Sequence, residues 1–160
     1  MKILVIGGSG FVGWAVLSAD TAGIDLTYTY NTTPLTHPHA TGVQLDIRDS
    51  AATRELLCVV NPDCIIHAAA MTDVDYCENH TDEAYETNVR GTEHVLDVAA
   101  RTESHMVYVS TAAVFDGSDN PYETAANLSP VSVYGQTKAT AERRVEQAPV
   151  PSAIVRTDQP

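Results

Sequence analysis

The stretch Lys2-Ile3-Leu4-Val5-Ile6-Gly7-Gly8-Ser9-Gly10-Phe11-Val12-Gly13 decides the fold of this chain. Its apolar, β-branched opening is typical of a buried strand, and glycines at positions 7, 10 and 13 follow directly. In such a turn the first glycine permits the tight turn, the second lets a pyrophosphate approach, and the third allows close helix–strand packing. Because a strand precedes the turn and a helix-like segment follows it, we predict a dinucleotide-binding loop rather than a simple tight turn. Its candidate binding residues are Gly7, Gly10, Phe11, Val12 and Gly13.

Apolar runs and helix-like segments alternate along the whole chain. The expected strands are Lys2 to Ile6, Asp25 to Tyr30, Gly42 to Leu45, Asp63 to His67, His105 to Ser110 and Ser152 to Arg156. The expected helices are about Gly10 to Ala22, Ala51 to Val60, Glu83 to Thr102 and Val131 to Gln147. This alternation predicts an α/β fold, a doubly wound parallel sheet of six strands with helices on both faces, in one domain.

The composition excludes several classes of protein. The net charge is −12 and no basic patch is present, which argues against nucleic acid as a partner. No apolar run approaches the ~20 residues that span a bilayer, so we expect no membrane partner. Cys58, Cys64 and Cys77 form no C-x-x-C pair, so we expect a reducing, cytoplasmic location and no metal site. Lysine is scarce beside abundant acid residues, as in proteins adapted to high salt.

Tyr134 and Lys138 are the candidate acid–base pair. They lie four residues apart, which on a helix places both side chains on one face. A nearby ammonium stabilises a phenolate, so we expect Lys138 to lower the pKa of Tyr134 from its ordinary value of about 10. A phenol tuned in this way works as a proton donor near neutral pH. The alternative is an ordinary exposed helix face.

The ribose end of the predicted cofactor site has no acid residue. A carboxylate about 20 residues beyond the glycines would select NAD, but Tyr30, Asn31 and Thr32 stand there instead. No arginine is present at that place to bind a 2′-phosphate, and the missing carboxylate favours NADP slightly over NAD. Asp46, beside Ile47, is a candidate partner for the adenine, with a loop or cap aspartate as the alternative.

Further motifs point to a known family. They are Leu45-Asp46-Ile47-Arg48-Asp49, His67-Ala68-Ala69-Ala70-Met71-Thr72-Asp73-Val74-Asp75-Tyr76-Cys77-Glu78, Asn88-Val89-Arg90-Gly91-Thr92, Ser110-Thr111-Ala112-Ala113-Val114-Phe115-Asp116-Gly117, Tyr134-Gly135-Gln136-Thr137-Lys138 and Ile154-Val155-Arg156-Thr157. With the glycine turn, they resemble the extended short-chain dehydrogenase/reductase (NAD-dependent epimerase/dehydratase) superfamily, and within it the dTDP-4-dehydrorhamnose reductases. The resemblance implies a Rossmann fold, NADP or NAD as cofactor, and a 4-keto sugar nucleotide as substrate.

The resemblance also implies roles for individual residues. Thr111, Tyr134 and Lys138 match the catalytic hydroxyl, the proton donor and the lysine that holds the nicotinamide ribose. Ala68, Ala69 and Ala70 match a wall that lets the dinucleotide lie close, with ordinary small-residue packing as the alternative. We expect His67 to end a buried strand, and Asn88 to tie loops to the sheet.

Three interpretations stay open. The first is the nucleotide-binding part of a dTDP-4-dehydrorhamnose reductase, in a chain expected to lack the carboxyl-terminal substrate domain. The second is part of an epimerase or dehydratase, which Ala112 and Ala113 favour because the reductases commonly have Asp-Tyr there. The third is a dinucleotide-binding or regulatory module without catalysis. Relatives often form homodimers through helices matching Glu83 to Thr102 and Val131 to Gln147.

Overall fold

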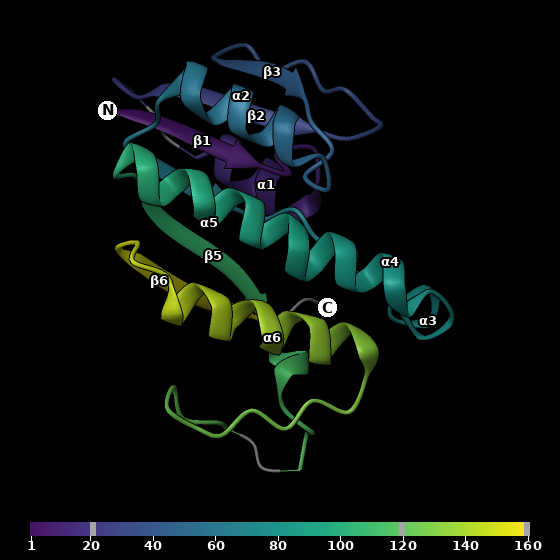
Figure 1. Cartoon of the computed structure of the whole chain (residues 1–160). Coiled ribbons are helices and arrows are strands. Elements are labelled where there is room, and N and C mark those ends of the chain that lie inside the picture. The colour runs from purple at the N-terminus through teal and green to yellow at the C-terminus, as the bar shows by residue number, and fades with distance from the viewer. Residues whose placement is uncertain (20–21, 119–120, 159–160) are drawn as a thin grey trace.

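The computed structural model describes residues 1–19, 22–118 and 121–158, and its centre is a six-stranded parallel sheet (Figure 1). The strand order is β3-β2-β1-β4-β5-β6, so the chain crosses from one side of β1 to the other after β3. The strands are β1 (Lys2–Ile6), β2 (Asp25–Tyr30), β3 (Ala40–Gln44), β4 (Cys64–His67), β5 (His105–Thr111) and β6 (Ser152–Thr157). The predicted doubly wound sheet is confirmed.

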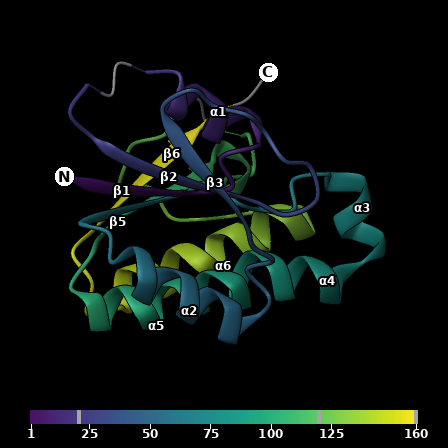
Figure 2. The same cartoon turned by 90° about the horizontal axis from the view of Figure 1, so that it is seen from above.

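Helices cover both faces of this sheet, as expected. Helices α2, α5 and α6 lie together on one face, and α1 lies on the other (Figure 2). The helices are α1 (Phe11–Leu17), α2 (Ser50–Val60), α3 (Val74–Asn79), α4 (Thr81–Tyr85), α5 (Gly91–Thr102) and α6 (Val133–Gln147). A π-turn, Glu86–Arg90, joins α4 to α5, and a 3-10 turn, Ala112–Val114, follows β5.

Several predicted boundaries were wrong. Helix α1 ends at Leu17 instead of continuing to Ala22; residues 20–21 of that prediction lie outside the described part of the chain. β3 covers Ala40–Gln44 rather than Gly42 to Leu45. Helix α3 was not predicted at all, because it is short and depends on Asp73, whose carboxylate accepts a hydrogen bond from the Tyr76 backbone N–H.

The larger hydrophobic core lies between the sheet and the three-helix face. It is formed by buried side chains of β1, β4, β5, α2, α5 and α6: Leu4, Ile6, Leu57, Ile65, Val95, Leu96, Val98, Ala99, Met106, Tyr108, Ala141 and Val145. Each fully buried leucine or isoleucine contributes about 1.5–3 kcal/mol. A smaller cluster of Val5, Leu17, Leu26 and Tyr28 holds α1 to the opposite face.

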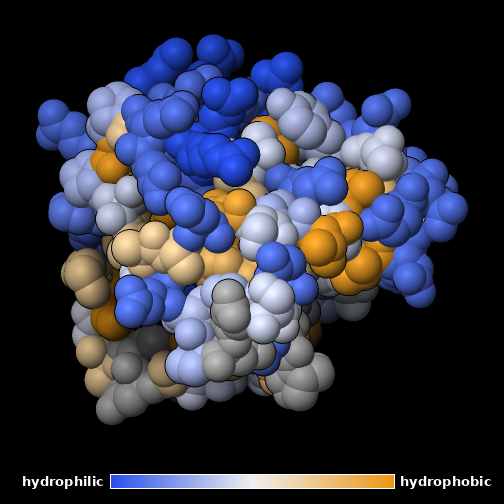
Figure 3. All heavy atoms as spheres, turned by 90° about the horizontal axis from the view of Figure 1, so that it is seen from below, coloured by the Kyte–Doolittle hydropathy of each residue, from blue (hydrophilic) through white to orange (hydrophobic). Residues whose placement is uncertain are grey.

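Hydrophilic side chains cover most of the face that carries the loop after β5, with apolar side chains in separate patches (Figure 3). Across the described ranges, no helix has the length and apolar character needed to cross a membrane. Nor do the described His, Cys, Asp and Glu side chains form a group of three or more that could hold a metal ion.

Candidate active site

Two adjoining cavities open where β1, β4 and β5 end. The first, which we call the glycine-loop cavity, has a volume of about 500 Å³ and is lined by Gly7, Gly10, Gly13, Asn31 and Asp46, among others. The second, the Tyr134 cavity, has a volume of about 570 Å³ and is lined by Thr111, Tyr134 and Lys138, among others. Both share one wall, formed by Val12, Ala68, Ala70 and Thr72. Such cavities are expected outside the carboxyl ends of parallel strands, at the point where the strand order reverses.

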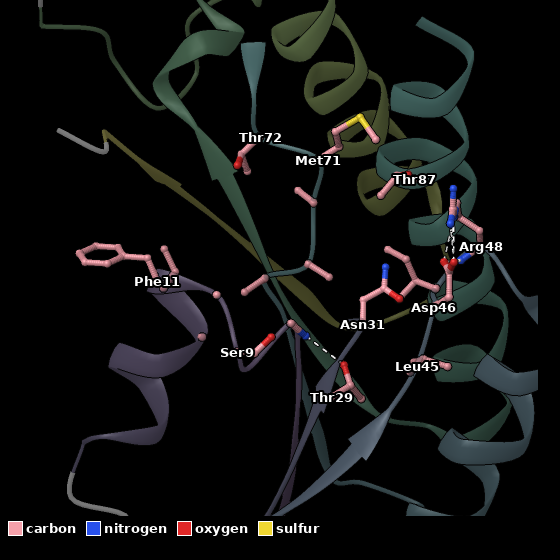
Figure 4. Close-up of a pocket in the computed structure, with 18 of the residues that line it drawn as sticks. Ser9, Phe11, Thr29, Asn31, Leu45, Asp46, Arg48, Met71, Thr72 and Thr87 are labelled. Atoms are coloured by element: carbon pink, nitrogen blue, oxygen red, sulfur yellow. Dashed lines mark hydrogen bonds and ion pairs between the residues drawn. The ribbon is translucent and has the colours of Figure 1, made fainter. Parts of the chain in front are cut away.

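The glycine turn is packed so closely that side chains would not fit at Gly7 or Gly13, nor at Gly8, where a Cβ would lie 2.6 Å from the Tyr28 Cβ. Gly7 has a φ of +85°, and a Cβ there would lie 2.6 Å from the Ala69 backbone nitrogen. A Cβ at Gly13 would lie 2.2 Å from the Gly7 carbonyl oxygen. The Gly7 N–H donates to the Thr29 hydroxyl of β2 at 3.0 Å (Figure 4). The predicted tight turn and close helix–strand contact are both present.

Gly10 differs from these glycines. The nearest atom to a Cβ at Gly10 is the Gly7 carbonyl oxygen at 3.4 Å, an ordinary contact, so packing within the chain does not exclude a side chain. Gly10 also precedes α1 as its cap residue and offers no side chain to accept from the first backbone N–H groups of the helix. The Phe11 ring, 76% exposed, points away from the cavity (Figure 4). The turn therefore leaves backbone donors open to an anion in the cavity.

The far end of the glycine-loop cavity holds an ion pair that was not predicted. Arg48 donates from Nε and NH2 to the Asp46 carboxylate, with distances of 3.0 and 2.6 Å to Oδ2. Asn31 lies beside this pair and also lines the cavity (Figure 4). The arginine neighbour lowers the pKa of Asp46. No arginine stands next to Asn31 in the sequence, and we therefore expected none at this end of the cavity. In the structure Arg48 reaches this end from the loop after β3.

Asn88 holds the wall between the cavities to the helix that carries Tyr134. Its Oδ1 accepts from the Met71 N–H at 2.7 Å, and its Nδ2 donates to the Met71 carbonyl at 3.0 Å. The same amide donates to the Thr137 hydroxyl at 3.0 Å. Asn88 lies in the π-turn, a feature that often marks functional sites. Asn88 therefore ties the loop after β4 to helix α6, and not to the sheet as expected.

The start of α6 is fixed by three contacts. The Ser132 hydroxyl accepts from the Gly135 N–H at 3.1 Å, and the Glu78 carboxylate of α3 accepts from the Val133 N–H at 2.7 Å. A Cβ at Gly135 would lie 2.2 Å from the Ala113 carbonyl oxygen, so α6 lies directly against the turn that follows Thr111. The local backbone thus brings Tyr134 and Thr111 into one cavity.

The Thr111 hydroxyl is available as a donor. Its oxygen accepts from the Ala113 N–H at 3.1 Å, which leaves its own proton free to donate. The hydroxyl also tends to lower the pKa of Tyr134, but burial of the phenol outweighs this effect, and the pKa is raised. The expected lowering by Lys138 is therefore wrong for the structure as it stands. Across the described residues, no hydrogen bond joins Lys138 to Tyr134.

The Lys138 side chain is directed at the sheet. Lys138 is 3% exposed, and its Nζ donates to the Val109 carbonyl at 2.7 Å and lies 4.1 Å from the centre of the Tyr108 ring. Burial disfavours the ammonium and lowers its pKa to about 7, against the opposing effect of Glu142. The pKa of Lys138 therefore lies near neutral pH, whereas the pKa of Tyr134 lies above its ordinary value.

His67 ends β4 in the core, as predicted. Its Nε2 lies 3.1 Å from the Thr92 hydroxyl, and its ring lies 5.6 Å from the Tyr108 ring, measured between centroids. Burial, followed by the nearby Lys138 charge, lowers the pKa of His67 to about 3. The imidazole is therefore neutral near pH 7 and lines neither cavity.

All of the residues predicted to be catalytic or to bind the cofactor line one of the two cavities. The glycine-loop cavity takes Gly7, Gly10, Phe11, Val12, Gly13, Asn31, Asp46, Ile47, Ala68, Ala69 and Ala70, and the Tyr134 cavity takes Thr111, Tyr134 and Lys138. Lining residues that sequence reasoning missed include Ser9, Thr29, Arg48, Met71, Glu83 and Thr87. Thr29 is a buried polar residue of β2, and its burial is visible only in the structure.

Known proteins have similar sequences and similar structures. A dTDP-4-dehydrorhamnose reductase from Aggregatibacter actinomycetemcomitans is 36% identical over 115 residues, which are 71% of this chain and 39% of that protein. Subunit beta of methionine adenosyltransferase 2 from Bos taurus is 28% identical, covering 97% of this chain and 46% of that protein. A dTDP-4-dehydrorhamnose reductase from Bacillus anthracis, solved in complex with NADP, has a TM-score of 0.80 and 26% identity. The match covers 98% of this chain and 53% of that structure.

The chain therefore spans about half of the length of these relatives, or less. The family described as the RmlD substrate binding domain matches residues 1–159. That match covers both cavities and every residue discussed above. This chain belongs to the RmlD substrate binding domain family.

Proposed function

We propose that this chain is the NAD(P)-binding, acid–base part of a reductase that converts dTDP-4-dehydrorhamnose to dTDP-L-rhamnose. One observation carries the proposal. Thr111, Tyr134 and Lys138, separated by up to 27 positions in the sequence, line one cavity that shares a wall with the glycine-loop cavity. A cofactor in one cavity would then meet a substrate in the other at the shared wall.

The residues of the glycine-loop cavity fit a dinucleotide. The backbone at Gly10 is open to a pyrophosphate, and the small side chains of Ala68, Ala69 and Ala70 leave room along the wall. Arg48 supplies a cation beside Asn31, at the end predicted to hold the adenine and its ribose. The positive charge of Arg48 favours NADP, the cofactor bound in the Bacillus anthracis relative. The ion pair with Asp46 partly neutralises that charge and so weakens the preference for NADP.

Three side chains of the Tyr134 cavity supply the acid–base chemistry. A reduced nicotinamide supplies the hydride that a ketone carbon accepts. Tyr134 donates its proton to the ketone oxygen as negative charge develops there, and Thr111 donates a hydrogen bond to the same oxygen. Lys138 holds the nicotinamide ribose, and its ammonium offsets the effect of burial on the Tyr134 phenol when the two approach.

The first experiment separates cofactor binding from turnover. Fluorescence titration gives the Kd for NADPH and for NADH, and NADPH oxidation is then followed with the dTDP-4-keto-6-deoxy sugar. We expect binding of both dinucleotides, with NADPH preferred, and formation of dTDP-L-rhamnose. Failure to bind either dinucleotide would refute the whole proposal.

A second candidate function is a dinucleotide-binding subunit without catalysis. It is favoured by the similarity over 97% of the chain to subunit beta of methionine adenosyltransferase 2. Dinucleotide binding without turnover would support this candidate. An epimerase or dehydratase activity, which Ala112 and Ala113 favour, would instead appear as a new sugar nucleotide without net NADPH oxidation.

We further propose that the chain acts in the cytoplasm, and that two copies associate through α5 and α6. The Glu93–Arg144 ion pair already joins these helices within one copy. Analytical ultracentrifugation over a range of protein and salt concentrations would measure the association.

A further inference from the structure

Glu142 is a fully buried carboxylate that the proposed reaction does not use. It is 0% exposed and lies four residues after Lys138 on α6, so the two side chains share one face of the helix, one turn apart. Burying a carboxylate is costly unless it is paired and hydrogen-bonded. Its partners therefore indicate what the residue does.

Arg156 of β6 binds the Glu142 carboxylate with two of its guanidinium nitrogens. Its Nε lies 2.9 Å from Oε1 and its NH2 lies 2.7 Å from Oε2, the bidentate geometry that fixes a carboxylate most firmly. The same guanidinium donates from NH1 to the Thr124 carbonyl at 3.0 Å and lies 5.2 Å from the centre of the Phe115 ring. Arg156 is thus held independently, and it holds Glu142 in one orientation.

Apart from Asp116 and Asp158, which also line the Tyr134 cavity, the other groups around Lys138 carry no negative charge near pH 7. From β5 come the Val109 carbonyl and the Tyr108 ring, whose pKa is raised by burial. From β4 comes His67, which is neutral because burial lowers its pKa to about 3. On α6, burial likewise keeps the Tyr134 phenol protonated. Among the described groups that act on the Lys138 charge, Glu142 is the anion.

We propose that Glu142 is a positioning residue for the acid–base pair: clamped by Arg156, it is the counter-charge that keeps buried Lys138 as an ammonium on the wall of the Tyr134 cavity. This role in catalysis rests on the function proposed above. The electrostatic coupling itself does not, and it is measurable without any substrate.

The scarcity of lysine makes the coupling directly observable. The chain has two lysines, Lys2 and Lys138, so labelling lysine with ¹³C at Cε gives two NMR signals, and Lys2→Arg assigns them. In the unmodified chain, the Lys138 signal is expected to titrate near pH 7. In Glu142→Gln the midpoint should fall by roughly one pH unit or more, because the negative charge that opposes the effect of burial on Lys138 is then removed.

A matched control removes a carboxylate from the same helix without touching the buried pair. Glu146 is exposed on α6, and Glu146→Gln should leave the Lys138 midpoint unchanged. An unmoved Lys138 midpoint in folded Glu142→Gln would overturn the proposal. If circular dichroism shows that this variant is unfolded, Glu142→Gln/Arg156→Gln replaces it, since it leaves no unpaired arginine, and the same downward shift is expected.

Enzyme kinetics extend the test to catalysis. In Glu142→Gln the alkaline limb of the kcat–pH profile should move to lower pH with the Lys138 midpoint, while the KM for NADPH stays the same. A role in stability alone would scale kcat equally at every pH and would contradict the catalytic part of the proposal. A chain that never turns over would refute the proposed function, and the NMR titration would still decide the role of Glu142.

Discussion

The two cavities share a wall but are built in different ways. The glycine-loop cavity is shaped mainly by backbone, with Gly7 and Gly13 allowing contacts that no side chain would permit. The Tyr134 cavity depends on buried, titratable side chains, above all Lys138 and, behind it, Glu142. Backbone geometry follows closely from local sequence, whereas the charge state of a buried group depends on everything packed around it. The variants below test this difference between the cavities.

The largest expected effect is on the chemistry of the Tyr134 cavity alone. Tyr134→Phe removes the proton donor, so kcat should fall by about 100- to 10,000-fold, the usual contribution of general acid catalysis. The Kd for NADPH should stay the same, because the glycine-loop cavity is untouched. Tyr76→Phe makes the same chemical change on exposed α3 and should keep full activity. Substantial turnover by Tyr134→Phe would show that another group protonates the substrate.

Two glycine variants test the glycine-loop cavity in contrasting ways. Gly13→Ala places a methyl group 2.2 Å from the Gly7 oxygen, so it should lower the free energy of unfolding by about 1–3 kcal/mol and abolish dinucleotide binding. Gly10→Ala meets only an ordinary 3.4 Å contact and should unfold like the unmodified chain. Its methyl group would still obstruct the pyrophosphate, so affinity should fall by about tenfold or more. Urea denaturation and fluorescence titration measure both; unchanged binding in Gly10→Ala would contradict the assignment.

The side chains behind the Tyr134 cavity should make stability depend on pH. The pKa of His67 is about 3 in the folded chain and near 6.5 in the unfolded chain, so below pH 6.5 the unfolded state binds more protons. The free energy of unfolding should therefore decrease as pH falls, by about 2 kcal/mol between pH 6.5 and 5 from this group. His67→Gln keeps a partner for Thr92 and should remove most of this slope in urea titrations. An unchanged slope would show that His67 is protonated in the fold.

The smallest expected effect concerns the Arg48 end of the glycine-loop cavity. The Asp46–Arg48 pair is 35% and 44% exposed in its two side chains, so solvent screens its interactions. Arg48→Gln should weaken NADPH binding by about two- to fivefold and leave NADH binding nearly unchanged. The ratio of the two Kd values is the readout, and an equal loss for both cofactors would place Arg48 away from the 2′-phosphate.

The sequence predicted the backbone-built features more fully than the electrostatic ones. The bounds of β1 and β2 were predicted correctly, because strongly apolar, β-branched runs end there at glycine or polar residues. The spacing of Tyr134 and Lys138 placed them on one helix, and both line the same cavity. The pKa direction of Tyr134 was wrong, because spacing does not reveal that Lys138 turns toward Val109.

Three further omissions have physical explanations. Arg48 lies far from Asn31 in the sequence and reaches the same end of the cavity only through the conformation of the loop after β3. The sequence therefore did not predict that the two residues lie together. The π-turn at Glu86–Arg90 was not expected, because its residues continue an ordinary helical pattern. Glu142 was missed since a glutamate on a polar helix is usually exposed, and only the sheet behind α6 makes it buried.

The π-turn has a consequence for how the chain tolerates insertions and deletions. A π-turn holds about one more residue per turn than the α-helices on either side of it. It therefore absorbs one extra residue between α4 and α5 while the two helices continue in nearly the same direction. Deleting one residue from Glu86–Arg90 would close this wider turn into a regular α-helix, and α4 and α5 would keep nearly the same orientation relative to each other. Asn88 could then no longer hold both Met71 and Thr137. A one-residue deletion at this turn is therefore expected to keep the fold and to detach the loop after β4 from α6.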